Sequence, residues 1–70
     1  MIINKEYRDL VKKVKRFSNK IERLFVLDKS GVRVRVQLLT ALNVRNVAAE
    51  KANQIRVDAG KNKIFTYWGF

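Results

Sequence analysis

The chain has 70 residues, with 16 Lys and Arg against 6 Asp and Glu, a net charge of +10, and neither cysteine nor histidine. Without those two residue types it can form no disulfide, and a zinc site would need carboxylates alone, so we expect no metal and no cofactor. An apolar content of 47% is too high for a disordered basic tail, which leaves a small folded domain that binds something anionic.

The N-terminal part of the chain predicts an amphipathic helix over about residues 4–18. Asn4 is a candidate N-cap, and Ser18-Asn19 is a candidate end, although the pattern could carry the helix to Arg23. The apolar residues follow a spacing of three and four: Tyr7, Leu10, Val11, Val14, Phe17, Ile21, Leu24 and Phe25. The remaining surface is basic, and we expect it to face solvent or phosphates while the apolar side packs on a sheet.

The next segment predicts a β-hairpin. Ile21–Leu27 is rich in bulky apolar residues, and Asp28–Gly31 has turn chemistry, with Gly31 free to take a positive φ. From Val32 to Leu38 apolar and polar residues alternate, so a strand over Val32–Leu39 would turn its valines to the core and Arg33 and Arg35 to the other face.

A second helix should follow, starting at Thr40 or Asn43 and ending near Asn53 or Gln54. Ile55–Asp58 then begins a third strand, residues 59–62 make a turn, and Lys63–Phe70 forms a fourth. The predicted fold class is therefore α+β, in the order α-β-β-α-β-β, with helices packed on one face of a four-stranded antiparallel sheet. We expect one domain over residues 1–70, with the helix at 4–18 and the ββαββ unit at 21–70.

Catalysis is poorly supported by the sequence. None of the six acids forms a convincing pair with another, and the two serines have no histidine to act as a base. The three glycines make no phosphate-binding loop. We therefore expect a binding protein and no enzyme.

Arginines at two places predict phosphate contacts. Arg33 and Arg35 share one strand face, which Arg56 and Lys63 on later strands would extend; the alternative is a solvated sheet face. Arg45 lies near the start of the second helix with no acid before Glu50, which suits a phosphate shared with the helix N-terminus. The alternative for Arg45 is a side chain that simply points to solvent.

The C-terminal ten residues combine basic and aromatic side chains. Lys61 and Lys63 could contact phosphates while Trp68 stacks on bases or wedges between them. The alternative is that the aromatics complete the core of a small domain, and strand alternation would place Phe65 and Tyr67 on the face opposite Trp68.

Residues from about 24 to 69 resemble the small monomeric, DNA-bending chromosomal proteins of methanogenic archaea. The resemblance rests on Leu24–Asp28 with Gly31, on Thr40, Arg45, Ala48, Ala52 and Asn53, on Ile55–Val57 and on Gly60–Ile64. It implies sequence-tolerant binding and bending of duplex DNA, with Arg45 at the position of a DNA-contacting arginine. The chain departs from the family at Val44, where the family has a proline.

The sequence thus predicts an architectural nucleic-acid-binding protein of low sequence specificity, with DNA a better partner than RNA and no membrane partner. The proposed contacts are Arg33, Arg35, Arg45, Arg56, Lys61, Lys63 and Trp68. Two alternatives stay open: an RNA-binding or ribonucleoprotein component, and a small viral-type inhibitor or adaptor that binds a protein. A homodimer also stays open, and the expected location is cytoplasmic, on a nucleoid or in a virion, in an archaeon or a virus.

Overall fold

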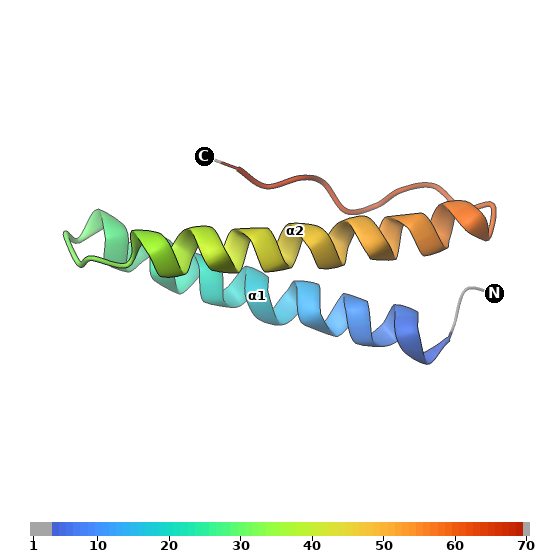
Figure 1. The fold of residues 1–70 in the computed structure, drawn as a ribbon, viewed down its shortest axis with the longest axis horizontal. Helices are drawn as coiled ribbons and strands as arrows, with labels where there is room; N and C mark the ends of the chain where they lie inside the picture. The colour runs from blue at the N-terminus through green and yellow to red at the C-terminus, as the bar shows by residue number, and fades with distance from the viewer. Residues whose placement is uncertain (1–3, 70) are drawn as a thin grey trace.

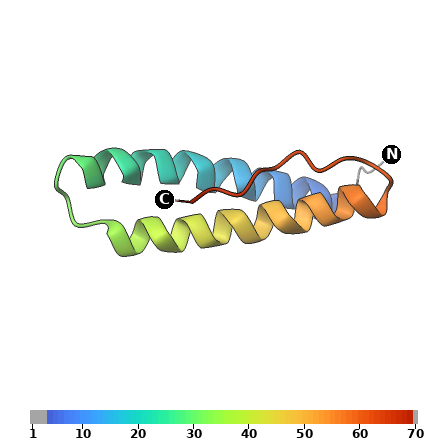
Figure 2. The ribbon, with the colours of Figure 1, turned by 90° about the horizontal axis from the view of Figure 1, so that it is seen from above.

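The computed structural model describes residues 4–69 and shows a helical hairpin followed by an extended tail (Figure 1). Helix α1 spans Lys5–Lys29 and helix α2 spans Arg35–Asp58. The tail, residues 61–69, runs back along α2, and seen from above it lies between the two helices (Figure 2). The molecule is elongated, with extents of 45 × 20 × 14 Å.

The predicted α+β fold with a four-stranded sheet is wrong, because residues 4–69 contain two helices and no strand. Ile21–Leu27 lies inside α1, and Ile55–Asp58 forms the last turn of α2. Val32–Leu39 divides between the loop and the start of α2, and residues 63–69 are extended without a strand partner. The stretches that carry the resemblance to the chromosomal proteins therefore lie in helices and in the tail.

Helix α1 starts where the sequence predicts and continues eleven residues beyond the predicted end at Ser18. Asn4 is confirmed as the N-cap, because its side chain accepts a 2.6 Å hydrogen bond from the backbone N–H of Tyr7. Ser18 does not end the helix, since its hydroxyl donates to the carbonyl of Val14 at 2.7 Å, one turn back. The apolar stripe then continues through Ile21 and Leu24, which holds the helix against α2.

The alternating segment Val32–Leu39 is helical from Arg35 on, because its buried residues fit the helical period as well as the strand period. Val34 and Leu38 are both buried, and because they are four residues apart they fit a helix as well as a strand. The strand model also required Val32 and Val36 to be buried, yet they are 46% and 75% exposed. Beyond Leu38 the buried positions recur every three or four residues, which is the spacing of a helix and not of a strand.

The core consists of larger side chains from α1 packed against an alanine-rich face of α2. The buried residues of α2 are Leu38, Ala41, Leu42, Arg45, Ala48, Ala49 and Ala52. Two clusters form, one around Ile21 and Leu38, to which Trp68 of the tail adds, and one around Val14 and Ala48, to which Phe65 adds. The tail therefore acts as a third layer, filling space that the alanines leave.

Glycines mark both turns. Gly31 has a φ of 89°, which confirms the prediction for that position, and Gly60 has a φ of 79° after α2. Across the first turn, Asp28 and Arg35 form an ion pair with an Oδ2–Nη2 distance of 3.0 Å. In the part of the chain that is described, no helix is both long and apolar enough to cross a membrane.

Candidate nucleic-acid interface

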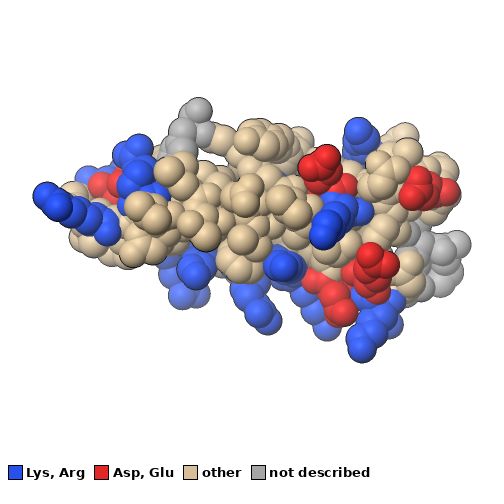
Figure 3. Space-filling model, in the orientation of Figure 1, with Lys and Arg blue, Asp and Glu red and all other residues tan. Residues whose placement is uncertain are grey.

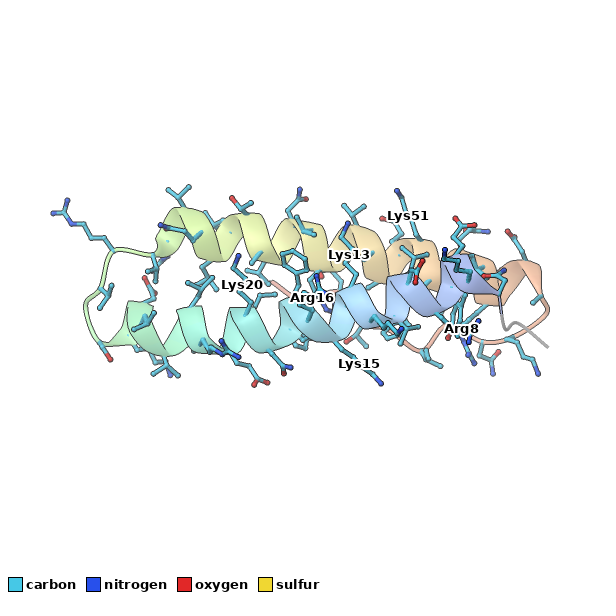
Figure 4. All side chains as sticks on the ribbon, turned by 90° about the horizontal axis from the view of Figure 1, so that it is seen from below. Arg8, Lys13, Lys15, Arg16, Lys20 and Lys51 are labelled. Carbon is cyan, nitrogen blue, oxygen red and sulfur yellow. The ribbon has the colours of Figure 1, made fainter. Side chains whose placement is uncertain are left out.

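The exposed side of α1 carries a row of basic side chains, which we call the α1 ridge. Its members are Arg8, Lys12, Lys13, Lys15, Arg16, Lys20 and Arg23, and all of them are exposed. Figure 4 views the hairpin from the side of α1 that faces away from the tail and labels five of them along the helix. Figure 3 shows the same basic row along the lower edge of the molecule, with acidic groups concentrated at the end where α1 begins.

The α1 ridge follows from a simple feature of the sequence. Leu10–Ile21 contains five Lys or Arg and no acid, and at 3.6 residues per turn they occupy the helix surface that the apolar stripe leaves free. Among residues 4–69 no ion pair engages any member of the ridge. The Lys20 ammonium does lie 5.7 Å from the centroid of the Phe17 ring. The ridge is thus a strip of unneutralised positive charge, of the kind that attracts an anionic polymer.

Arg33 and Arg35 lie at the end of the hairpin where α1 turns into α2. Arg33 is exposed in the loop. Arg35 is in the first turn of α2, where its guanidinium donates to both carboxylate oxygens of Asp28, at 3.0 and 3.4 Å. Part of its charge is therefore neutralised within the protein.

Arg45 lies in the middle of α2, and only 3% of its surface is exposed. Its Nη1 donates to Asn46 Oδ1 at 3.0 Å and to the carbonyl of Thr66, and its guanidinium carbon lies 4.1 Å from the centroid of the Trp68 ring. Its Nε has no hydrogen-bond partner within residues 4–69, and burial lowers the pKa of the guanidinium by desolvation. This burial disagrees with both alternatives that the sequence offered for Arg45, a side chain pointing to solvent and a phosphate contact.

The remaining predicted contacts lie in the last turn of α2 and along the tail. Arg56 donates from Nε to the carbonyl of Asn62 at 2.7 Å and from Nη1 to the hydroxyl of Tyr7 at 3.2 Å. Lys61 and Lys63 are exposed, and Trp68 is half-buried against the core.

The predicted site residues therefore do not gather on one face. The sheet that was to align them is missing from residues 4–69, and Arg33 and Lys61 lie beyond opposite ends of α2, a helix of 24 residues. What the structure brings together is the buried Arg45 with the half-buried Trp68. The basic residues that do share one surface belong to α1, for which the sequence had predicted solvent or phosphate contact.

Two residues that the sequence reasoning missed, Asn46 and Asn53, fasten the tail to α2. Asn53 Oδ1 accepts from the backbone N–H groups of Ile64 at 3.1 Å and Phe65 at 3.0 Å, and its Nδ2 donates to the carbonyl of Phe65 at 2.7 Å. Asn46 Oδ1 accepts from the N–H of Trp68 at 3.0 Å, and its Nδ2 donates to the carbonyl of Trp68 at 2.7 Å. Their seven-residue separation, which places them on one side of a helix, was the available signal.

Within residues 4–69 no group of three acidic, histidine or cysteine side chains could hold a metal ion. Comparison of the chain with models of protein families, with curated protein sequences and with solved structures found no match in any of the three.

Proposed function

We propose that the chain is a non-enzymatic protein that binds duplex nucleic acid, DNA in preference to RNA, through phosphate contacts from the α1 ridge. The observation that carries this proposal is the row of seven exposed basic side chains on one helix, none of them in an ion pair within residues 4–69. Each ammonium or guanidinium that replaces a counterion at a phosphate contributes affinity without reading sequence. The proposed role is architectural, on a nucleoid or in a virion.

The shape of the ridge supports a duplex over a single strand. Arg8 and Arg23 are fifteen residues apart on a continuous helix, which corresponds to about 22 Å at 1.5 Å per residue. A straight, rigid strip of this length suits the regular phosphates of a duplex. Binding of single strands relies on aromatic rings that stack on bases, and the one aromatic residue between Arg8 and Arg23 is Phe17, which is half-buried beneath Lys20.

The test compares two variants that are matched in charge. In the ridge variant Lys12, Lys15 and Arg16 are changed to Gln; in the control the same changes are made at Lys61, Lys63 and Arg33. Binding to a duplex of fixed length is measured by fluorescence anisotropy over a range of salt concentrations. The logarithm of the affinity should fall with log salt by about 0.9 per phosphate contact, so the ridge variant should lose up to about 3 units of slope. A control that loses as much slope as the ridge variant would refute the assignment to α1.

One observation favours single-stranded RNA as a second candidate. Tyr67 is 84% exposed and lines a groove of about 500 Å³ beside Asn43, Gln54 and Lys63, so it offers a ring for stacking next to amides that can hydrogen-bond to base edges. Competition between duplex DNA, duplex RNA and single strands separates the two candidates. Under the second one, Tyr67→Ala weakens single-strand binding and leaves duplex binding unchanged.

A further inference from the structure

The tail is attached to α2 in the manner of a bound peptide. Asn53 and Asn46 each hold both the N–H and the carbonyl of one tail residue, Phe65 and Trp68 respectively. Arg45 adds a hydrogen bond to the carbonyl of Thr66. These contacts go to the backbone, so they recognise an extended conformation without depending on which chain supplies it.

Two aromatic side chains of the tail complete the recognition. Phe65 packs on the cluster of Val14, Ala48 and Ala49, and Trp68 packs on the cluster that includes Leu38. The side chains between and around them are exposed, with Tyr67 at 84%. The surface between α1 and α2 that the tail occupies, which we call the groove, therefore fits an extended peptide with aromatic residues at two positions three apart.

We infer that the groove between α1 and α2 is a peptide-binding site that also accepts the tail of a second copy of this chain, so that two copies exchange tails. A second copy is the partner whose peptide is known to fit, because the same segment occupies the groove here. A reciprocal exchange keeps every groove contact, and only the connection between α2 and the tail must change. Exchange of an identical element between copies is a low-cost route to a dimer.

The connection is suited to such a change. It consists of a short turn in which Gly60 has a φ of 79° and no atom lies within 4 Å of an added Cβ, so no side chain packs on Gly60 itself. The hydrogen bonds that shape it join residues close in the sequence: Gly60 N–H donates to the carbonyl of Val57 at 3.0 Å, Lys61 N–H to that of Arg56 at 2.8 Å, and Arg56 Nε to that of Asn62 at 2.7 Å. When the tail leaves, the apolar, alanine-lined groove is exposed to water. That exposure is unfavourable, so binding of another tail in the groove is favoured.

Charge sets the conditions under which exchange appears. Two copies with a net charge of +10 repel each other, so the tail stays on its own chain in dilute solution at low salt. A flexible connection also gives a segment an effective concentration in the millimolar range at its own site. Exchange is therefore expected at high protein concentration and in about 0.5 M salt, where the repulsion is screened.

The test uses two full-length variants that complement each other. One carries Asn46→Ala and Asn53→Ala and keeps an intact tail; the other carries Phe65→Ala and Trp68→Ala and keeps an intact groove. Each alone should be monomeric by native mass spectrometry, and an equimolar mixture should give a 1:1 heterodimer. If both variants are helical by circular dichroism and the mixture remains monomeric, tail exchange is refuted.

A measurement on the unmodified chain covers the case in which a variant does not fold. Isotope-labelled and unlabelled chains are mixed at about 1 mM total in about 0.5 M salt, the conditions in which exchange can compete with binding in cis. Isotope-filtered NMR should then show contacts between the Trp68 indole of one copy and the Leu38 methyl groups of the other. If such contacts are seen only within one copy, the inference is overturned. Neither experiment contains nucleic acid, so both are independent of the proposed function.

Discussion

The guanidinium of Arg45 lies against the face of the Trp68 ring, with 4.1 Å between its central carbon and the ring centroid. The two residues come from the middle of α2 and from the tail, so the contact joins the helical hairpin to its third layer. The ring covers a cation that has lost most of its contact with water and finds no carboxylate among its hydrogen-bond partners within residues 4–69. A cation–π contact of this kind offsets part of the cost of burying the charge.

Substitution of Arg45 separates its charge from its packing. Arg45→Met keeps the aliphatic volume beneath Trp68 and removes the desolvated charge, so the free energy of unfolding should stay within about 1 kcal/mol of the native value. Arg45→Ala leaves a space under the ring and should lower it by about 2–3 kcal/mol. Urea unfolding followed by circular dichroism measures both. If the Met variant is as unstable as the Ala variant, the charge itself contributes to stability.

Trp68→Ala should destabilise the whole hairpin, because the indole fills space next to Ile21 and Leu38 that the alanines of α2 do not reach. The ring is half-buried, so we expect a loss of about 2–3 kcal/mol, less than the roughly 3–5 kcal/mol typical of aromatic truncations in a core. Tyr67→Ala is the neighbouring control: its ring is 84% exposed, and the change should cost less than about 0.5 kcal/mol. Equal losses at the two positions in thermal unfolding would show that the tail does not pack as described.

Asn53→Asp tests the fastening of the tail with an almost isosteric change. The carboxylate still accepts from the N–H groups of Ile64 and Phe65, but it can no longer donate to the carbonyl of Phe65. We expect faster hydrogen exchange at tail amides and a loss of about 1 kcal/mol, while α1 amides keep their protection. Asn43→Ala, at an exposed position of the same helix, should leave tail exchange rates unchanged. Unchanged rates in the Asp variant would contradict the hydrogen-bonding scheme.

The ion pair of Asp28 and Arg35 should tolerate exchange of its charges. Asp28 lies in the last turns of α1 and Arg35 in the first turn of α2, so each is unfavourably placed in the dipole of its own helix. Asp28→Arg or Arg35→Asp alone puts like charges together and should lower stability by about 0.5–1 kcal/mol. The double variant restores the pair with both dipoles satisfied and should be as stable as the native chain or about 0.5 kcal/mol more stable. A double-mutant cycle in low salt measures this coupling.

The sequence predicted α1 well at its start and poorly at its end. Asn4 and the spacing from Tyr7 onward were sufficient for the start, because capping and the helical period are local properties. The strand at Val32–Leu39 was predicted from a short alternating run in which Val34 and Leu38 satisfy both periods, so the exposed positions of Val32 and Val36 decided the outcome. The exposure of a side chain depends on which segments pack together. A window of eight residues does not contain that information.

The candidate site was harder to predict, because arginine is usually a surface residue. Arg45 was assigned to the start of the second helix, with a phosphate or solvent as its partner, whereas it lies in the middle of α2. Its burial depends on a tail that returns over α2 from more than twenty residues later. The α1 ridge, in contrast, could be found from the acid-free run Leu10–Ile21 once that run is placed on a helix. A charge pattern within one helix can be predicted from the sequence, because it depends on local spacing. Contacts between distant segments cannot be predicted in this way.

Asn46 and Asn53 hold the tail through its backbone, so the chain can serve as a scaffold that presents short sequences to solvent. Since the grip uses main-chain groups together with Phe65 and Trp68, the intervening and preceding side chains carry none of the attachment. Residues 63, 64, 66 and 67 point outward and can be exchanged as a set. Four side chains of chosen chemistry could thus be held in an extended form on a frame of two helices, of 25 and 24 residues.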